Sequence, residues 1–232
     1  MDHKTTQFRP LALLVCAVGL LGTPIAAHAT IYHVGLPTDT LNTQAVFPYS
    51  LDFLFTDGSG TGDGNNTVSL TNFAFDPGGA PLGSPVLTGG ASGSLGTGLT
   101  LTDNSFVNEA IQGFTPGSSP GSSLSFDLST TTNFDGVTPD LLSAYLVDGN
   151  NNTVPTTDSA AQSLFTIELD SGGPSVTPYA GVAPYMGLTP TITPAGPSPV
   201  PELSSFFSLG ALLAGGTLTR LRLSRFRWRA GS

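Results

Sequence analysis

The chain has 232 residues with 16 acidic and only 7 basic side chains, and every Lys and Arg lies near one of its ends. Because the span between Arg9 and Arg220 is purely acidic, it cannot neutralise phosphates, and we expect no nucleic-acid partner. With 29 Gly and 19 Pro residues, the composition favours short strands and turns and predicts a single all-β domain.

Residues 1–29 have the parts of a secretory signal: a basic start, an apolar run over 11–21, and the small residues Ala27 and Ala29 before the cleavage point. We expect signal peptidase to cut after Ala29 during export across the inner membrane. An uncleaved anchor is the alternative, but the apolar run is shorter than the ~20 residues of a membrane span. Cys16, the only cysteine, lies in this run, so we expect no disulfide in the mature chain.

From residue 30 to residue 170, short runs of alternating apolar and polar residues are separated by Gly, Asp and Pro turns. A slip of the alternation after Leu70 predicts a bulge. Such spacing without helical periodicity predicts an antiparallel β-sandwich or jelly-roll-like domain, with a barrel or solenoid as the alternative. We expect strands over residues 31–36, 49–55, 68–75, 95–101, 106–114, 124–128, 141–147 and 165–169.

Two Gly- and Asn-rich loops alternate oxygen-bearing side chains with glycine. Asp57 and Asp63 lie in the first loop, over residues 57–66, and Asp148 opens the second, over 148–152. Because calcium prefers several oxygen ligands on a flexible loop, weak calcium binding is one interpretation. A plain polar hairpin connection is the other, and no other cofactor is expected.

Catalytic patterns are sparse. Residues 117–121 fit the G-x-S-x-G pattern, but a strand rather than a helix follows, so a hairpin turn is expected and a triad with His33 is disfavoured. A glycosidase needs two facing carboxyl groups. The polar sides of three predicted strands carry Asp52, Asp127 and Glu168, which we interpret as solvated surface charge.

Beyond residue 170 the composition changes twice. Residues 171–198 are rich in proline on a Gly, Thr and Ser background, which predicts a semi-rigid spacer that could extend over roughly 90 Å. Residues 203–219 are apolar and uncharged, and predict a transmembrane helix; an amphipathic basic tail on a surface is the alternative. By the positive-inside rule, the cytoplasmic stop would be the cluster Arg220, Arg222, Arg225, Arg227 and Arg229.

The order of motif, apolar segment and arginine cluster over residues 199–229 resembles a PEP-CTERM sorting domain, with Leu203 where that family has its second Pro. The motif residues are Pro199, Val200, Pro201 and Glu202. The resemblance implies processing by an exosortase-like membrane transpeptidase in an exopolysaccharide-producing Gram-negative bacterium. Four stretches of the body also resemble PEP-CTERM-associated β-domains: residues 50–58, 65–73, 106–117 and 143–148.

Together these patterns predict an exported protein that is anchored in the membrane or displayed at the cell surface. We expect a non-enzymatic β-domain with an extracellular-matrix or biofilm role that contacts exopolysaccharide. The alternative is a carbohydrate-binding module, assisted by calcium. A hydrolase is disfavoured because His33 is the only histidine of the expected mature chain and the body has no Lys or Arg.

Overall fold

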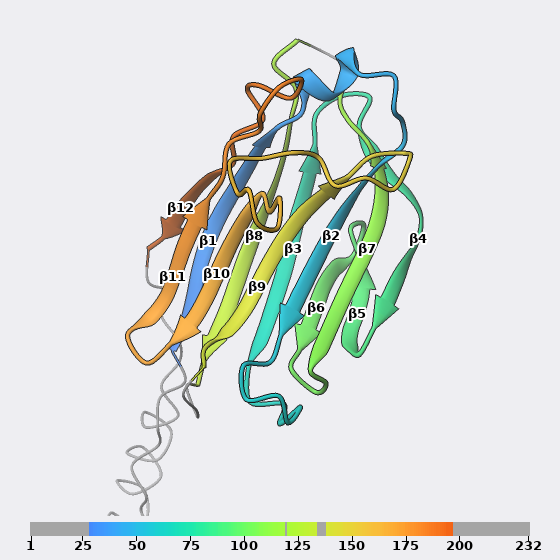
Figure 1. Cartoon of the computed structure of the whole chain (residues 1–232). Helices are drawn as coiled ribbons and strands as arrows, with labels where there is room; N and C mark the ends of the chain where they lie inside the picture. Colours follow the sequence, from blue (N-terminus) through green and yellow to red (C-terminus); the bar gives the residue numbers. More distant parts are fainter. Residues whose placement is uncertain (1–27, 119, 134–137, 197–232) are drawn as a thin grey trace, which may run out of the picture. The chain divides into compact units, whose positions relative to one another are not determined.

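The computed structural model describes residues 28–118, 120–133 and 138–196, which form two antiparallel β-sheets stacked face to face (Figure 1). Several predictions fall outside these residues: the signal before residue 28, the sorting motif at 199–202, and the apolar segment with its arginine cluster. Within the described ranges, no helix is long and apolar enough to cross a membrane.

Sheet A contains six strands in the order β12-β1-β8-β3-β6-β5, and sheet B contains six in the order β11-β10-β9-β2-β7-β4, counting only the described part of the chain. A short 3-10 helix, η1 (Asp39–Thr43), joins β1 to β2. The strand bounds are β1 His28–Pro37, β2 Tyr49–Thr56, β3 Thr67–Phe75, β4 Ala80–Thr88, β5 Gly90–Ser94, β6 Gly98–Thr102, β7 Val107–Thr115, β8 Ser123–Thr132, β9 Asp140–Val147, β10 Phe165–Asp170, β11 Gly173–Pro178 and β12 Thr191–Ala195.

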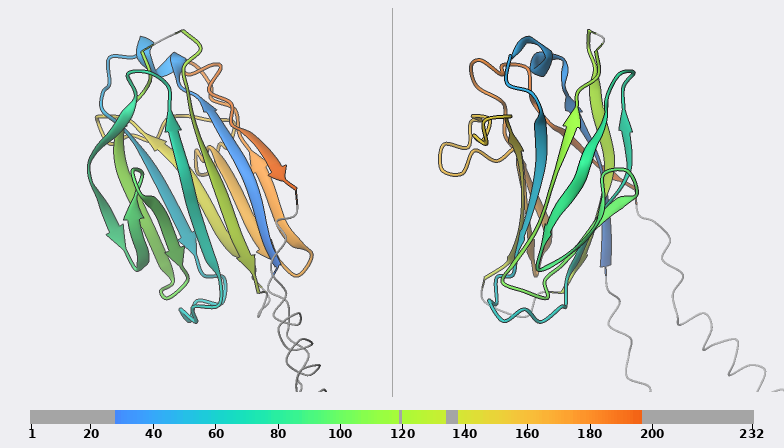
Figure 2. Two further views of the ribbon diagram at one scale, coloured as in Figure 1. Left: turned by 180° about the vertical axis from the view of Figure 1, so that it is seen from behind. Right: turned by 90° about the vertical axis from the view of Figure 1, so that its right-hand side faces the viewer.

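The strand pairing is nested. β1 pairs with β8, β2 with β7, and β3 with β6, and each successive pair lies in the other sheet. The later strands β9, β10 and β11 then extend sheet B beside β2, while β12 extends sheet A beside β1. Figure 2 shows the two sheets from behind and from the side. The sheets are separate, so the barrel and solenoid alternatives do not describe this fold.

The core lies between the sheets and follows from alternation within each strand. In β2, Tyr49, Leu51, Phe53 and Phe55 are fully buried, while the residues between them face outward. Phe53 meets Phe126 of β8 edge to face, with ring centroids 5.7 Å apart, so sheet B and sheet A are joined through aromatic contact. The inward side chains of both sheets form one continuous cluster.

The sequence predicted eight of the ten strands that the structure describes up to residue 170. Eight predicted strands match β1, β2, β3, β6, β7, β8, β9 and β10 within a few residues. The predicted bulge is also confirmed, because the pairing of β3 with β8 shifts register between Thr71 and Ala74. Asn72 lies inside this bulge with a positive φ of 55°, a conformation that Asn tolerates.

The predicted spacer over residues 171–198 is wrong as far as residue 196. Strands β11 and β12 belong to the sandwich, and the segment between them places Tyr185 and Leu188 in the core. Both strands are sheet edges, where Pro174, Pro178 and Pro194 are tolerated because an edge strand can lack a ladder N–H. The β-domain therefore extends well beyond its predicted end at residue 170.

Strands β4 and β5 were not predicted from the sequence. β4 contains Gly83 and Pro85 and is interrupted by a register shift, but it is an edge strand of sheet B. The chain passes from β4 to β5, and so from sheet B to sheet A, through Gly89 alone. Gly89 has φ +61°, and a Cβ there would collide with the backbone oxygen of Val107.

Two of the expected hairpins are instead crossings between the sheets. Residues 57–66 lead from β2 in sheet B to β3 in sheet A, and the segment containing residues 117–121 leads from β7 in sheet B to β8 in sheet A. The third, over 148–152, is a tight turn after β9, because Val147 bridges Thr153. Local turn chemistry marks where a strand ends, but not which sheet the chain enters next.

One excursion borders the outer face of sheet B. Val154 and Leu164 donate backbone hydrogen bonds to Leu146 and Ala144 of β9, and the residues between them, 155–163, loop out from the sheet (Figure 2). Asp158 organises this loop by accepting the backbone N–H of Ser163 at 3.1 Å. We call residues 155–163 the border loop.

Candidate functional site on the outer face of sheet B

The centre of sheet B presents a mixed apolar and acidic surface to the outside. Asp52 of β2 lies directly opposite Ile111 of β7 on one side and Tyr145 of β9 on the other. Ile111 in turn lies opposite Val86 of β4. Residues directly opposite in an antiparallel pair share one face of the sheet, so these four form a row across four strands.

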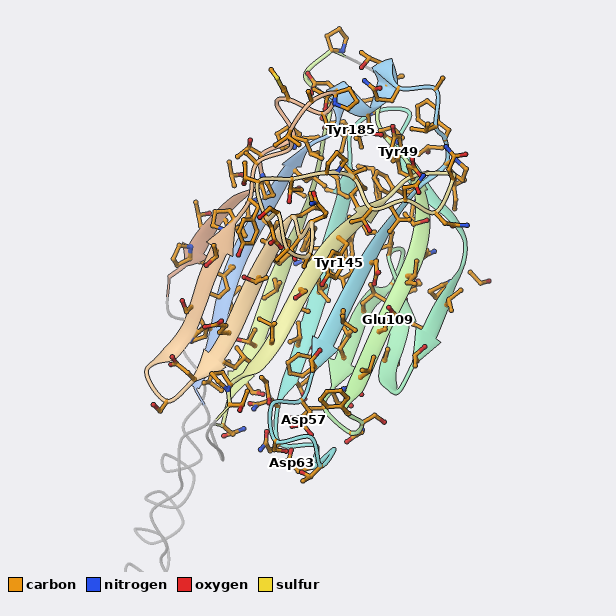
Figure 3. The ribbon with its side chains drawn as sticks, viewed as in Figure 1. Tyr49, Asp57, Asp63, Glu109, Tyr145 and Tyr185 are labelled. Carbon is orange, nitrogen blue, oxygen red and sulfur yellow. The ribbon has the colours of Figure 1, made fainter. Side chains whose placement is uncertain are left out.

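A second row lies beside the first and includes another carboxylate. Glu109 of β7 faces Thr88 of β4 and Leu54 of β2, and Leu54 faces Ser143 of β9. Figure 3 shows Glu109 and Tyr145 on the viewer's side of the sheet, on either side of β2. We define the sheet-B face as these two rows, in which Ser143 is buried: Val86, Ile111, Asp52, Tyr145, Thr88, Glu109, Leu54 and Ser143.

Asp52 is the unusual group of the sheet-B face. Its Oδ1 atom is buried and has no hydrogen-bond partner among the residues that the structure describes. Burial, together with the nearby charge of Glu109, raises the pKa of Asp52 to about 7. A carboxyl group with an unused buried oxygen and a raised pKa differs from the solvated surface charge expected from the sequence, and it makes Asp52 a candidate for a functional group.

Two phenylalanines outside the sheet-B face, Phe47 and Phe106, are exposed, whereas exposure of the tyrosines is limited. Tyr32, Tyr49 and Tyr185 are buried, whereas Tyr145 and Tyr179 are partly exposed. Tyr145 is therefore the tyrosine that stands beside a carboxyl group on an open sheet face. An apolar ring with a polar tip next to a hydrogen-bonding acid suits ligands that have both C–H faces and hydroxyl groups.

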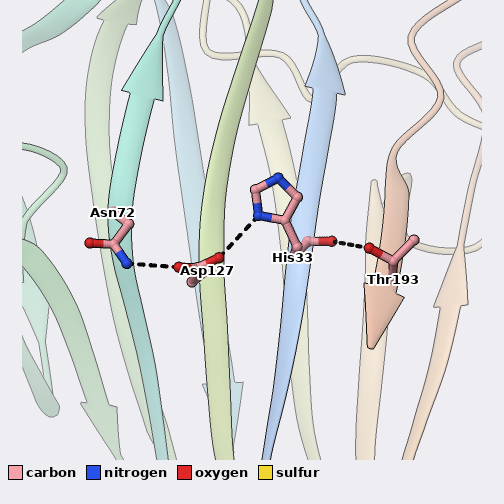
Figure 4. Close-up of polar contacts among 4 residues, drawn as sticks. All are labelled: His33, Asn72, Asp127 and Thr193. Carbon is pink, nitrogen blue, oxygen red and sulfur yellow. Dashed lines mark hydrogen bonds and ion pairs between the residues drawn. The ribbon is translucent and has the colours of Figure 1, made fainter. Parts of the chain in front are cut away.

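On the outer face of sheet A, in contrast, the carboxylate of Asp127 has hydrogen-bond partners. Asp127 of β8 accepts hydrogen bonds from His33 Nδ1 at 3.0 Å and from Asn72 Nδ2 at 2.7 Å (Figure 4). Those bonds, first from Asn72 and then from His33, lower the pKa of Asp127. The bulge in β3 positions Asn72 for this contact, and Thr193 Oγ1 of β12 donates to the backbone oxygen of His33.

The three carboxylates considered for a glycosidase do not share a face. Asp52 and Glu168 lie in sheet B, whereas Asp127 lies in sheet A. The acid that accompanies Asp52 is Glu109, which the sequence analysis counted only as charge. Its only sequence signal is an outward position in the strand predicted over 106–114, and the cross-strand register was needed to place it beside Asp52.

The hydrolase pattern at 117–121 is not assembled into a triad. His33 is committed to Asp127 in the middle of sheet A, while the pattern lies between the end of β7 and the start of β8. Ser119 itself lies outside the described residues. Ser122, just after the pattern, is buried and donates to the backbone oxygen of Gly117 at 2.9 Å.

In the loops considered for calcium, the carboxylates accept hydrogen bonds from backbone N–H groups of the same loop. Asp57 is buried and accepts the N–H groups of Ser59 and Gly60 at 2.7 and 3.1 Å. Asp63 accepts the N–H of Asn65 at 3.2 Å, and its side chain is exposed. These contacts are the Asx-type bonds of ordinary turns.

Asp148 lies at the other end of β2 from the first loop, because β2 and β9 run antiparallel. Its Oδ1 accepts the N–H groups of Asn150 and Asn152, each at 2.9 Å. The structure therefore does not bring Asp148 together with Asp57 and Asp63. In the described part of the chain, no group of three or more His, Cys, Asp or Glu side chains is arranged to hold a metal ion.

Two buried carboxyl groups, Asp103 and Asp140, lie at the end of the sandwich near the first loop. Asp103 accepts the backbone N–H of Asn66, and Asn66 Nδ2 donates to Asp140 at 2.8 Å. Asp140 also accepts the N–H of Gly58 at 2.8 Å. Burial, opposed by the Asn66 bond and reinforced by Asp140, raises the pKa of Asp103 to about 7.

The predicted cleavage point can be placed in part. Ala29 lies in β1, opposite Thr131, while Ala27 lies outside the described residues. A chain beginning at Thr30 would keep Tyr32, Val34 and Leu36, the buried side chains of β1.

Comparison of the chain with protein-family models, with curated proteins and with solved structures finds no match.

Proposed function

We propose that this chain is an exported, surface-displayed β-sandwich of jelly-roll-like topology that binds polysaccharide through the sheet-B face and serves in an extracellular matrix or biofilm. The domain acts without catalysis, as a binding module. The observation that carries the proposal is Asp52, a half-buried carboxyl group set between Tyr145 and Ile111 whose buried Oδ1 has no hydrogen-bond partner among the described residues.

Polysaccharide suits this surface for a chemical reason. Sugar rings offer apolar C–H faces and many hydroxyl groups, so they can cover Ile111 and Tyr145 while hydrogen-bonding to the carboxyl groups of Asp52 and Glu109. The border loop leaves the sheet beside β9, next to this surface. A non-catalytic contact of this kind needs no nucleophile and no metal.

The export part of the proposal rests on the sequence of the two chain ends. The signal over 1–29 and the PEP-CTERM-like segment over 199–229 would direct secretion, membrane insertion through residues 203–219, and processing by an exosortase-like enzyme. Intact-mass analysis of the cell-surface protein tests this. We expect a mature protein that begins at Thr30 and ends near Glu202; a chain ending at Ser232 would contradict processing.

Binding is tested with the secreted protein by affinity electrophoresis in gels containing α-glucan, β-glucan, galactan or mannan. We expect at least one polymer to retard migration, and Tyr145→Ala to weaken that retardation about tenfold or more, as loss of an aromatic anchor does. Tyr179→Ala is the matched control, a partly exposed tyrosine outside the sheet-B face. Equal binding by both variants and the wild type would refute the proposed site.

The non-enzymatic part needs its own measurement. A carboxyl group with a pKa near 7 beside a second carboxylate is also the pairing that glycosidases use, which makes hydrolysis the second candidate function. Incubation with the bound polymer should release no reducing ends. Release that is abolished in both Asp52→Asn and Glu109→Gln would reassign the protein as a glycoside hydrolase.

A further inference from the structure

The charges around the sheet-B face all have one sign. Asp52 and Glu109 lie on the face, Glu168 of β10 lies on the same side of sheet B, and Asp158 lies in the border loop. The described residues contain no Lys or Arg that could offset them. An anionic polymer laid on this surface would meet only like charge, without a cation to pair its carboxylates or sulfates.

The first row also has a definite extent. Val86, Ile111, Asp52 and Tyr145 lie on four adjacent strands, so the row spans about 14 Å at the usual interstrand spacing of roughly 4.8 Å. That is the length of a short oligosaccharide segment. Apolar groups at both ends and a carboxyl between them match a chain whose rings are packed and whose hydroxyls are hydrogen-bonded.

The carboxyl of Asp52 suits hydroxyl ligands in either protonation state. The groups that surround it are Ile111 on β7, Leu54 on its own strand and Tyr145 on β9, with Glu109 on β7 as the neighbouring charge. When ionised it accepts hydrogen bonds, and when protonated it also donates one. A ligand carboxylate would instead raise the cost of ionising both acids.

We propose that the sheet-B face selects neutral, hydroxyl-rich polysaccharide along the row from Val86 to Tyr145, and that Asp52 and Glu109 reject uronic-acid or sulfated polymers. This inference rests on the proposed function, because it specifies the ligand class of the same site. It adds that the two carboxylates determine specificity through their charge.

The test compares one neutral polymer with its own charged derivative. The secreted protein is titrated with the glucan that retards it most and with the same glucan after oxidation of its primary alcohols to carboxylates. We expect the wild type to bind the oxidised polymer at least about tenfold more weakly, which corresponds to about 1.4 kcal/mol. The difference should shrink in high salt.

Charge-removing variants identify the cause. In the double variant Asp52→Asn, Glu109→Gln, we expect the preference to narrow to about threefold or less because both like charges are removed. Asp127→Asn removes one charge from the opposite face and serves as the control, with the preference unchanged. Tyr145→Ala should weaken binding of both polymers alike.

The outcomes separate the two proposals. Tyr145-dependent binding that is equal or tighter for the oxidised polymer overturns the neutral-ligand inference and leaves the proposed function intact. A preference that survives in the double variant also overturns the assigned role of the carboxylates. Absence of binding to any of the four neutral polymers and to the oxidised derivative overturns the proposed function together with the inference.

Discussion

Asp127 and Asp52 occupy comparable places on opposite outer faces of the sandwich, yet their surroundings differ completely. Asp127 is held by His33 and Asn72, and its pKa is lowered by those bonds. Asp52 has a buried oxygen with no hydrogen-bond partner in the described part of the chain, and burial beside Glu109 raises its pKa. The sheet-A carboxylate is therefore satisfied within the fold, whereas the sheet-B carboxyl is not, which is the basis of the binding proposal.

The largest expected effect is on the free energy of unfolding, and it concerns the core that lies between the two sheets. Phe53 supports the sheet-B face from beneath and contacts Phe126 of sheet A. Phe53→Ala should lower the free energy of unfolding by about 3–5 kcal/mol, because it opens a cavity between both sheets. Urea unfolding of the purified protein measures this.

The matched control for Phe53→Ala is Leu54→Ala, one residue away but facing outward from the same strand. Its side chain leaves solvent only in part on folding, so a loss below about 1.5 kcal/mol is expected. Equal losses for the two variants would contradict the assignment of inner and outer sides to β2.

An effect of intermediate size is the dependence of stability on pH. The protein contains carboxyl groups whose pKa is raised in the folded state and others whose pKa is lowered. The raised pKa values of Asp52 and Asp103 mean that the folded state holds these protons more tightly than the unfolded chain does. Their stabilising contribution is complete below about pH 4 and is lost as the pH rises through about 7. We expect the unfolding free energy to fall by at least about 1 kcal/mol between pH 5 and pH 8.

The same titration has a control in the groups of the opposite kind. The lowered pKa values of Asp127 and Asp158 give stability that is present above about pH 4 and lost below it. Asp103→Asn should therefore flatten the decline between pH 5 and pH 8, whereas Asp127→Asn should leave that decline unchanged. An unfolding free energy that rises from pH 5 to pH 8 would contradict the expectation that ionisation of Asp52 and Asp103 destabilises the folded state.

The smallest effects compare the two aspartates directly. At pH 8, Asp127→Asn should lower the unfolding free energy by about 1 kcal/mol, because an amide cannot accept both the His33 and Asn72 hydrogen bonds as well as a carboxylate does. Asp52→Asn should leave stability unchanged or raise it slightly, because it removes a half-buried charge beside Glu109. Thermal unfolding of both variants under one condition measures the difference, and a destabilised Asp52→Asn protein would count against the site.

Much of this molecule could be read from local pattern. The alternation of residues 49–55 predicted both the strand and its buried side, and the slip after Leu70 marked the bulge of β3. Strands with glycine or proline, such as β4 and β11, lack that alternation and were not predicted. Their edge positions, which only the sheet order reveals, explain why such residues are tolerated there.

Sequence by itself determined the all-β class, the inward and outward sides of the central strands, and the purely acidic body, because each depends on neighbouring residues or on composition. The tertiary structure decided which carboxyl groups meet. Asp52 and Glu109 are far apart in the chain, as are His33 and Asp127, and only the register between strands brings each pair together. Register is a long-range property set by the packing of the whole core, so no local pattern could have distinguished the satisfied aspartate from the unsatisfied one.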